Sequence, residues 1–487
     1  MKGTTPLIAL TALFATSAHG QDNTCPDDFV QFDISFAKSG VFKVEGRFGE
    51  SSGQFDIFDQ LNVDQTGAAA DFIQNAVEVT PYGDVPLTYE GDGIWKTASG
   101  EQKTPVTIRY DLVPGHSAYE WKNGKEEVAY RFDEAYYFVG MRTLLANHAL
   151  ASCSPAITFN LPDGWSVAAP WPTTDGRTFR PADLERAYSN GFALGQNLLT
   201  FQSTFGDQGD VTFVYAKSVA DVAKLAANDM NRLADRYTDI FNGAAGSQFM
   251  IFMTDDTGND GGAFRDSFSM RFKTPVREAD GIVWRFGLAH ETLHLWMGHT
   301  IRPADGDIEW FKEGFTDYIT TKALYAEGVI DANNYERKLE ALIGRYVIAL
   351  VSGGPMSLVE AGHNKNHNRM MVYGGGAVVA LLLDAEMASQ NGPGAFETML
   401  ADVFAQSDQP YTQARLMSVL DQHSNGRASQ ILADIDQGLN PFVMADRLEA
   451  SGIILSVFTP EEMYVSFTGK GCNKPDAPCP PAHLRLP

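Results

Sequence analysis

The sequence predicts an α+β protein of more than one domain: an N-terminal antiparallel β-rich domain, then a mixed sheet followed by an all-α half. Three observations predict this class. The chain has 487 residues, more than one hydrophobic core usually organises. Short β-type runs alternate with Gly, Pro, Asp and Asn from about residue 29 to 213. Helical periodicity dominates later, most regularly beyond residue 393.

The composition indicates a globular protein with an acidic surface. Hydrophobic residues make up 44% of the chain, aromatic residues make up 11%, and the formal net charge is −24. Such a charge argues against nucleic acid or an anionic membrane as a partner, because both are polyanions. We interpret the acidity as a feature that favours solubility.

Residues 1–20 have the pattern of a secretory signal peptide. Lys2 precedes an apolar run from Leu7 to Phe14, and small residues at Ala18 and Gly20 predict cleavage before Gln21. The apolar run is too short to span a bilayer, and we expect no later membrane span. The chain is therefore predicted to be exported, to a periplasm or outside the cell.

Four cysteines agree with an oxidising compartment. They allow three pairings. We favour Cys472–Cys479, which closes a short proline-containing loop in the tail, and hence Cys25–Cys153, which ties the N-terminus to its own domain.

The domain limits follow from the local patterns. Residues 21–215 form the β-rich domain, with strand-like runs that include Gly40–Phe48, Thr104–Leu112 and Val211–Tyr215. Residues 216–455 form the second domain, and residues 456–487 form a C-terminal tail. The elements expected in the second domain are a helix at 221–241, a strand at 247–253, a helix from 331 or 333 to about 351, and helices at 395–405, 412–422 and 428–437.

Two histidines in one helix suggest a metal site. His290, Glu291 and His294 form an HExxH pattern, and a spacing of four residues puts both imidazoles on one face of a helix, one turn apart. We expect this helix to end near Gly298. The competing interpretation is an amphipathic core helix, but it gives Glu291 no role.

A catalytic zinc site takes three protein ligands and keeps a position for water. Glu313 lies nineteen positions after His294 (313 − 294), in a second helical segment, and suits the third position. Asp317 follows Glu313 by one turn on the same face. It can accept the remaining ring N–H of a ligand histidine and thereby fix the tautomer.

The segment from His290 to Tyr318 resembles the gluzincin metallopeptidases, and within them most closely the glycyl aminopeptidase family. It contains HETLHLW, then IRP, then WFKEGFTDY, and matches the family pattern without a gap. The resemblance implies a thermolysin-like domain in which His290, His294 and Glu313 bind one Zn²⁺ and Glu291 is the catalytic base. Many relatives continue into a PDZ domain, and residues 456–487 are too few for one.

Residues 254–272 depart from the family pattern where the family grips the substrate's amino terminus. The family's GGLEH-type segment, beside an edge strand that pairs with extended substrates, corresponds to GGAFR here. The candidate substrate-binding residues are Gly261, Gly262, Phe264, Arg265 and Asp266. Phe264 replaces the glutamate, so an aminopeptidase needs another acid, for which the candidates are Asp255, Asp256, Asp260 and Asp266. Arg265 could instead meet an acidic group of the substrate.

Tyr373 corresponds to the tyrosine of the family's YxKG segment, and Gly376 corresponds to its glycine, whereas the lysine is replaced by Gly375. The resemblance implies that Tyr373 donates a hydrogen bond to the oxyanion. The apolar run that follows is expected to be a buried core helix. His363 and His367, four residues apart in a Gly/Asn-rich stretch, are interpreted as exposed loop residues.

The sequence thus predicts a zinc peptidase that hydrolyses peptide bonds, with an aminopeptidase as the first expectation. Two alternatives stay open. Phe264 permits an endopeptidase or another peptidase that needs no free amine. A descendant that binds peptides without cutting them would be expected to carry a broken metal site.

Overall fold

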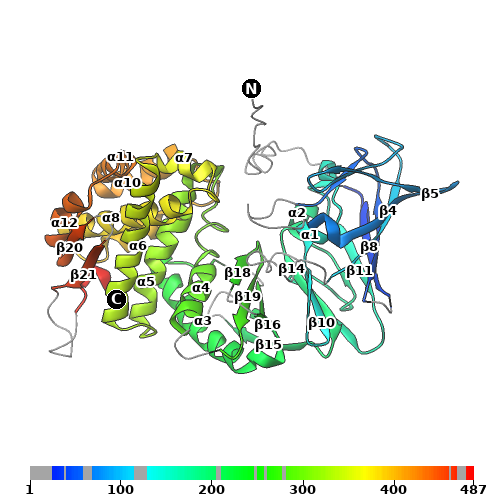
Figure 1. Cartoon of the computed structure of the whole chain (residues 1–487), viewed down its shortest axis with the longest axis horizontal. Helices are drawn as coiled ribbons and strands as arrows, with labels where there is room; N and C mark the ends of the chain where they lie inside the picture. The colour runs from blue at the N-terminus through cyan, green and yellow to red at the C-terminus, as the bar shows by residue number, and fades with distance from the viewer. Residues whose placement is uncertain are drawn as a thin grey trace.

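The computed structural model describes residues 25–37, 40–58, 69–114, 129–204, 210–245, 249–256, 260–276, 281–459, 462–468 and 479–486. The predicted signal peptide and Cys472 of the predicted tail disulfide lie outside these ranges. Sheets occupy one side of the molecule and helices the other (Figure 1). The predicted fold class, a β-rich N-terminal part followed by a mixed sheet and then helices, is confirmed.

Three sheets form the N-terminal part. A seven-stranded sheet has the order β13-β11-β1-β2-β8-β4-β5, a four-stranded sheet has the order β12-β14-β10-β9, and a three-stranded sheet has the order β3-β7-β6. The pairing is antiparallel except between β1 and β11, which run parallel. The strands are β1 Val30–Phe36, β2 Phe42–Phe48, β3 Gln54–Asp56, β4 Ile73–Thr80, β5 Gly83–Pro86, β6 Thr88–Gly91, β7 Ile94–Lys96, β8 Val106–Leu112, β9 Tyr130–Phe132, β10 Ala135–Val139, β11 Pro155–Asn160, β12 Trp165–Ala168, β13 Thr178–Phe179 and β14 Gly191–Gln196.

These sheets pack face to face through the buried side chains at alternate positions of their strands. In β2, Phe42, Val44 and Phe48 are buried and lie on one face, as expected for a half-buried strand. The Phe42 ring meets the ring of Phe138 in β10 at 5.1 Å, edge to face. The predicted Cys25–Cys153 disulfide is present, just before β1 and β11 begin. It ties the N-terminal end of the described chain to this sandwich.

The four-stranded sheet also contacts the second half of the protein. Phe138 belongs to the core of the N-terminal sandwich, whereas its neighbour Tyr137 packs at 5.0 Å against Phe252 of the next sheet. Adjacent residues of a strand face opposite sides. Strand β10 therefore contributes to both cores.

A mixed five-stranded sheet of order β15-β16-β17-β19-β18 begins the second half. Its strands are β15 Leu199–Thr204, β16 Asp210–Tyr215, β17 Phe249–Asp256, β18 Asp260–Ala263 and β19 Ser267–Lys273. β16, β17 and β19 run parallel, and β15 and β18 are antiparallel edge strands. Val211–Tyr215, which was expected to end the N-terminal domain, thus pairs with β17 instead. A β-type run predicts a strand but does not specify which sheet it joins.

Helices make up most of the remainder, and several predicted ranges agree with the observed ones to within two residues. The long helices are α3 Ala220–Phe241, α4 Gly281–Leu293, α5 Thr316–Ala326, α6 Ala332–Gly353, α8 Gly376–Asn391, α9 Ala395–Ala405, α10 Gln413–Ser424, α11 Arg427–Asp436 and α12 Pro441–Glu449. Short helices are α1 Gly140–Thr143, α2 Leu184–Tyr188 and α7 Leu358–His363. Two π-helical segments, η10 Phe311–Phe315 and η11 Met370–Gly375, lead directly into α5 and α8.

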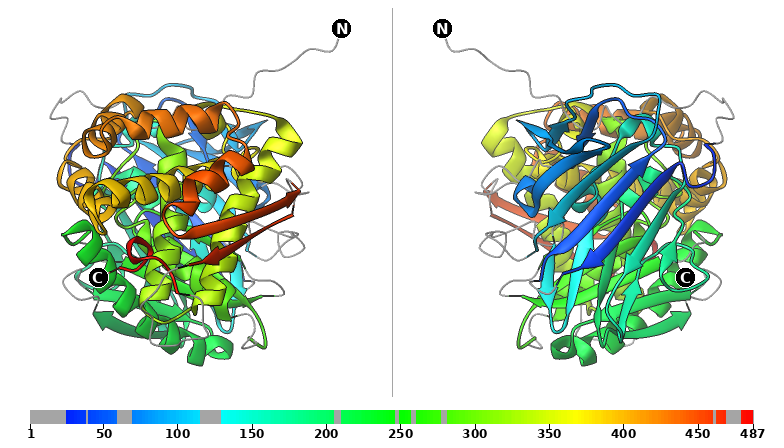
Figure 2. Two further views of the ribbon diagram at one scale, coloured as in Figure 1. Left: turned by 90° about the vertical axis from the view of Figure 1, so that its left-hand side faces the viewer. Right: turned by 90° about the vertical axis from the view of Figure 1, so that its right-hand side faces the viewer.

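Two local expectations were wrong. The HExxH helix α4 ends at Leu293 rather than near Gly298, because the following residues form tight turns in which Ile301 N–H donates to the Trp296 carbonyl. A hairpin, β20 Ile453–Thr459 with β21 Glu462–Phe467, crosses the predicted boundary between the second domain and the tail and lies across the outer face of the helical half (Figure 2). It shares the core of that half through Ile453 and Val465.

Within the described ranges, one helical stretch, Met370–Asn391, is long and apolar enough to cross a membrane by length and composition. Its most apolar window is 83% buried inside the protein. This stretch, η11 plus α8, is therefore the central core helix of the helical half, as expected for the apolar run after Tyr373.

Candidate metal centre

Helix α4 carries His290 and leads into the turn that carries His294. It lies between the five-stranded sheet and the helical half (Figure 1). Trp284, Leu288 and Thr292 form a buried stripe at four-residue spacing that fixes the helix against its neighbours. His290 is also buried, two residues after Leu288, and His294 follows in the turn that continues from the helix.

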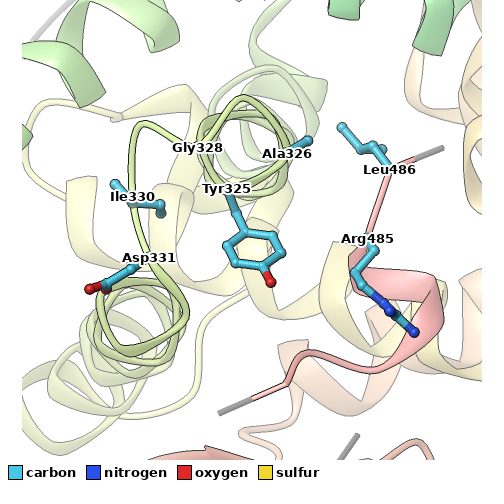
Figure 3. Close-up of a pocket in the computed structure, with 7 residues that line it drawn as sticks. All are labelled: Tyr325, Ala326, Gly328, Ile330, Asp331, Arg485 and Leu486. Carbon is cyan, nitrogen blue, oxygen red and sulfur yellow. The ribbon is translucent and has the colours of Figure 1, made fainter. Parts of the chain in front are cut away.

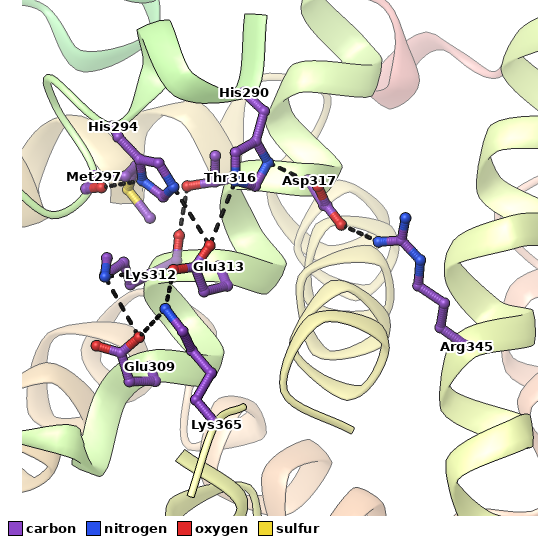
Figure 4. Close-up of polar contacts among 10 residues, drawn as sticks. All are labelled: His290, His294, Met297, Glu309, Lys312, Glu313, Thr316, Asp317, Arg345 and Lys365. Atoms are coloured by element: carbon purple, nitrogen blue, oxygen red, sulfur yellow. Dashed lines mark hydrogen bonds and ion pairs between the residues drawn. The ribbon is translucent and has the colours of Figure 1, made fainter. Parts of the chain in front are cut away.

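The two imidazoles are held with their Nε2 atoms facing a common point (Figure 4). His290 Nδ1 hydrogen bonds to Asp317 Oδ1 at 2.8 Å, and His294 Nδ1 hydrogen bonds to the Met297 carbonyl at 2.7 Å. Each Nδ1 faces an acceptor, so in the neutral imidazole that a metal requires Nδ1 carries the proton and Nε2 is left as the lone-pair donor. The predicted contact of Asp317 with a ligand histidine is present.

Glu313 completes the cluster. Its Oε2 lies 3.4 Å from His290 Nε2 and 3.3 Å from His294 Nε2. Ligand atoms about 2.0–2.2 Å from a tetrahedral zinc are about 3.4 Å apart, so these spacings suit one ion. Oε2 is buried and accepts no hydrogen bond from any described residue. A buried oxygen without a donor between two imidazole lone pairs fits a cation, and these three side chains are the described group that could hold one.

The other carboxylate oxygen of Glu313 is occupied by lysines. Lys365 Nζ donates to Oε1 at 2.7 Å, and Lys312 Nζ lies 3.3 Å from the same atom. Both lysines also contact Glu309 Oε2, at 3.0 and 3.4 Å (Figure 4). The carboxylate of Glu313 is thereby oriented so that a single oxygen faces the histidines.

Burial and the charges around the cluster shift the pKa values of its side chains. Burial alone would raise the pKa of Glu313, but Lys365 and Lys312 hold that pKa well below its usual value. Burial would lower the pKa of His290, but its hydrogen bond to Asp317 and the carboxylate of Glu313, 3.4 Å away, raise that pKa to about 10 in the metal-free protein. Burial lowers the pKa of His299 to about 3, so this nearby imidazole is neutral.

Two π-helical turns carry the site, and glycines pack them together. Glu313 lies in η10 and Tyr373 in η11. A Cβ atom on Gly314 would lie 2.5 Å from the backbone nitrogen of Ala377, and one on Gly376 would overlap the Trp310 carbonyl. The two backbones are therefore in direct contact. Such π-turns occur often at functional sites, where they reposition side chains.

Tyr373 and Glu291 lie close to the metal cluster, on two different elements. The Tyr373 ring stacks on the His290 ring at 6.1 Å with an interplanar angle of 17°. Burial and the neighbouring Glu313 raise the pKa of Tyr373, so its hydroxyl remains a proton donor. Glu291 forms no hydrogen bond or ion pair with the described residues, and its charge acts on both His290 and Tyr373.

The predicted substrate-binding residues fall into two groups. Gly261 and Gly262 lie in β18, the edge strand that contacts α4, as the thermolysin-like arrangement implies. Phe264 is buried in the core. Arg265 lies 3.6 Å from Glu185, and Asp266 is buried in a network with Arg186 and Asn190. That network joins the β18–β19 turn to the N-terminal part.

The acids considered as amine ligands do not surround the metal cluster. A Cβ atom on Gly287 would meet Met270, which fixes how α4 lies along β19. Three of the four acids lie at or beyond Met270 on the side away from His290: Asp255 pairs in register with Phe272, Asp256 with Lys273, and Asp260 with Arg271. Asp266 lies at the near end, but Arg186 and Asn190 hold it.

Several residues of the site gave no sequence signal. Lys365 approaches Glu313 from 52 residues away, and Arg345 of α6 donates to Asp317 Oδ2 at 2.5 Å from 28 residues away. Lys312 lies within the WFKEGFTDY motif and Glu309 lies directly before it, but their contacts depend on the direction of the turns of η10. No spacing rule connects these positions.

Two other features lie apart from the metal cluster. His363 is exposed and hydrogen bonds to Asp307, and His367 contacts Asn364, so neither joins the cluster. A cavity of 470 Å³ lies between the end of α5, the start of α6 and the C-terminal segment (Figure 3). None of the predicted site residues lines it; its lining is Tyr325, Ala326, Gly328, Ile330, Asp331, Arg485 and Leu486.

The fold and the ligand set, two histidines from HExxH and a distal glutamate, are those of zinc metallopeptidases of the gluzincin type. Residues 285–352 match the model of the M61 glycyl aminopeptidase family, which confirms the resemblance over the segment that carries the ligands. No curated protein sequence matches the chain.

Solved structures of M1-type peptidases share the fold. An aminopeptidase N family protein from Idiomarina loihiensis superposes with a TM-score of 0.70 at 16% identity, covering 88% of this chain and 79% of that one. The M1 zinc metallopeptidase from Deinococcus radiodurans gives 0.54 at 16% identity, with 85% and 94% covered. A mutant of that enzyme bound to a Tyr-Ser-Ala substrate gives 0.51 at 15% identity, also with 85% and 94% covered.

Proposed function

We propose that the protein hydrolyses peptide bonds with Glu291 as general base and Tyr373 as oxyanion donor, on a metal held by His290, His294 and Glu313. The observation that carries this proposal is the convergence of the Glu313 Oε2 atom, which accepts no hydrogen bond from the described residues, with the Nε2 atoms of both histidines. Bound zinc supplies a Lewis acid that lowers the pKa of a water from ~15.7 toward ~7.

The chain's own residues handle the protons. Glu291 has no other partner among the described residues, so its carboxylate can take a proton from the attacking water and return it to the leaving amine. Tyr373 keeps its proton and can donate a hydrogen bond to the carbonyl oxygen as that oxygen gains charge. The π-turn contact between Gly314 and Gly376 keeps this hydroxyl in place relative to Glu313.

The test is Glu291→Gln with zinc content measured in parallel. We expect peptidase activity to fall by about 10²–10⁴-fold, the usual contribution of a general base, while one zinc per chain is retained. The exposed Glu360→Gln on α7 is the matched control and should keep full activity. A Glu291→Gln protein that binds zinc and remains fully active would refute the assignment of the base.

The family match supports an aminopeptidase as the first candidate. The positions of the acids favour a second candidate, a peptidase that needs no free amine, because Asp255, Asp256 and Asp260 lie toward the far end of the sheet and Asp266 is held by Arg186. Paired peptides with a free and an acetylated N-terminus separate the two. Cleavage of both at similar rates supports the second candidate, and cleavage of only the free peptide supports the first.

We further propose that the protein acts after export. The signal-peptide pattern of residues 1–20 and the Cys25–Cys153 disulfide support this proposal. Fractionation of the source cells, with the N-terminus of the mature chain sequenced, tests it. A mature chain that starts at Gln21 outside the cytoplasm is the expected result.

A further inference from the structure

The charged side chains around the metal cluster do not cancel. Lys312 and Lys365 offset Glu309 and Glu313, to which they are bonded. Arg345 offsets Asp317, which it contacts at 2.5 Å. Among the described residues around the cluster, the charges that are left without an ion-pair partner are those of two cations, Lys338 and Arg369, and of one carboxylate, Glu291. The wall of the site is cationic before any metal ion is counted, in a chain whose net charge is −24.

Lys338 stands over a ring that borders the metal cluster. Its ammonium nitrogen lies 3.8 Å from the centroid of the Phe286 ring, and that ring lies 6.4 Å from the His290 ring. Phe286 precedes His290 by one turn of α4, so Lys338 reaches from α6 to the helix that holds the ligands. Lys338 is partly buried, and no acidic side chain among the described residues lies within ion-pair distance of it. Burial and Arg345 lower its pKa, and Asp317 offsets part of that effect.

Arg369 lies over the Tyr373 ring, as Lys338 lies over the Phe286 ring. It is the residue directly before η11, and its guanidinium carbon lies 5.6 Å from the centroid of the Tyr373 ring. Tyr373 stacks on His290. Arg369 is exposed, and it too lacks an ion-pair partner within the described ranges. The Phe286 and Tyr373 rings, which lie on His290, are thus each covered by a cation without a counter-ion among the described residues.

We propose that Lys338 and Arg369 are specificity-determining residues that select peptides with a carboxylate close to the bond that is cut. The inference rests on the proposed peptidase function and names its substrate class. A carboxylate would supply the counter-ion that both cations lack and would form charge-assisted hydrogen bonds with them. The carboxylate can belong to an acidic side chain or to the peptide's own C-terminus.

The excess of positive charge distinguishes this site from one that binds the ammonium group of a substrate. An ammonium group needs a carboxylate partner, and the acids around the cluster are bonded to lysines or arginine or, as Glu291, proposed to act as the base. A cationic wall repels an ammonium and attracts a carboxylate. The attraction acts at short range, because salt screens charges beyond about 8 Å at physiological ionic strength.

The experiment measures kcat/KM for matched peptides with zinc-loaded full-length protein. One pair differs only by Glu or Gln beside the bond that is cut, and a second pair differs only by a C-terminal acid or amide. We expect the wild-type protein to prefer the carboxylate member of at least one pair by about tenfold, an effect carried by KM. The pair that shows the preference identifies the source of the carboxylate.

Lys338→Met keeps the aliphatic contact with Phe286, and Arg369→Met keeps the contact with Tyr373, so both remove charge with little loss of packing. Each variant should reduce the preference by about threefold, and the double variant should abolish it. Lys338→Arg should restore it. Lys224→Gln, an exposed lysine on α3, is the matched control.

Zinc content and thermal unfolding of each variant show whether it is folded. Equal wild-type rates on both members of both pairs would overturn the inference and leave the peptidase function intact. So would a preference that survives in the folded double variant. Lack of hydrolysis of every peptide by the zinc-loaded wild-type protein would refute the proposed function itself.

Discussion

Lys365 Nζ donates a hydrogen bond of 2.7 Å to Glu313 Oε1, although 52 residues separate the two in the chain. This bond decides which oxygen of Glu313 faces the histidines. It also compensates a buried negative charge when no metal is bound, since Glu313 is only 3% exposed. The lysine thus stabilises the metal-free site in the geometry that zinc requires.

Replacing Lys365 by Met should destabilise the metal-free protein. Hydrogen bonds to charged groups contribute about 1.5–3 kcal/mol, and the Lys365 side chain is 28% exposed, so we expect a loss of about 2 kcal/mol. Urea unfolding in the presence of a chelator measures it. Lys43→Met removes a bond of 2.8 Å to Asp111 at a site where the lysine is 58% exposed and should cost under about 1 kcal/mol. Equal losses for the two variants would contradict the proposed role of Lys365.

Asp317 orients His290 and should therefore control metal affinity. Asp317→Asn keeps an oxygen that can accept the Nδ1 proton, but it loses the charge shared between His290 and Arg345. We expect zinc affinity to fall by about 10–100-fold, as for other carboxylates that orient a ligand histidine. Competition with a chromogenic chelator measures the dissociation constant.

Asp307→Asn is the matched control for this variant, because Asp307 hydrogen bonds to the exposed His363 at 2.6 Å, outside the metal cluster. Its zinc affinity should equal that of the wild-type protein. If Asp317→Asn also binds zinc as tightly as the wild type, the hydrogen bond to His290 has no part in holding the ligand.

The metal ligands could be predicted from sequence because helix geometry converts spacing into position. Four residues separate His290 from His294, and four separate Glu313 from Asp317, so each pair must share a face of its segment. The distance between the two segments is not fixed by such a rule. There the family resemblance, now matched over residues 285–352, supplied what periodicity could not.

The rest of the site depends on contacts between distant segments. Asn190 and Asp266 are 76 residues apart, yet their hydrogen bond makes Asp266 part of a buried network rather than a free acid beside the metal. The strand at Asp210–Tyr215 could be predicted as a strand, but its pairing with β17 could not, because local β-propensity carries no information about the partner strand.

Zinc binding should release a proton and tighten as pH rises. Asp317 and Glu313 raise the pKa of His290 from 6.5 to about 10 despite its burial, so at pH 7 the metal-free imidazole is charged. A zinc ligand must be neutral, and that proton has to leave. We expect release of about one proton per zinc at pH 7 from His290, and an affinity that rises about tenfold per pH unit until about pH 10. Calorimetry in buffers of different ionisation enthalpy measures the proton count.

The same shift affects the stability of the metal-free protein. Because the folded-state pKa is raised, this stabilisation is complete below about pH 6.5 and is lost as pH rises through about 10. Asp317→Asn removes the main cause, so it should release less than one proton at pH 7. Identical proton counts for the two proteins would show that Asp317 does not set the charge of His290.

Gly376 should be irreplaceable, because it is where α8 crosses the π-turn that carries Glu313. A Cβ atom there would overlap the Trp310 carbonyl oxygen and lie 2.9 Å from its carbon and 3.1 Å from Gly314 Cα. These are backbone atoms and cannot rotate away, so η10 or η11 must shift. We expect Gly376→Ala to cost about 3 kcal/mol of stability and to weaken zinc binding, because the shift moves Glu313 or Tyr373 relative to His290.

Gly344→Ala provides the contrast within the same half of the protein. Gly344 lies inside α6, and a Cβ atom there meets nothing within 4 Å. Alanine is the better helix former, so this variant should gain about 0.8–1 kcal/mol and bind zinc like the wild type. Unfolding curves and zinc titrations of both variants test the comparison. If Gly376→Ala proved as stable and as zinc-competent as Gly344→Ala, the two π-turns would not be held together by backbone contact.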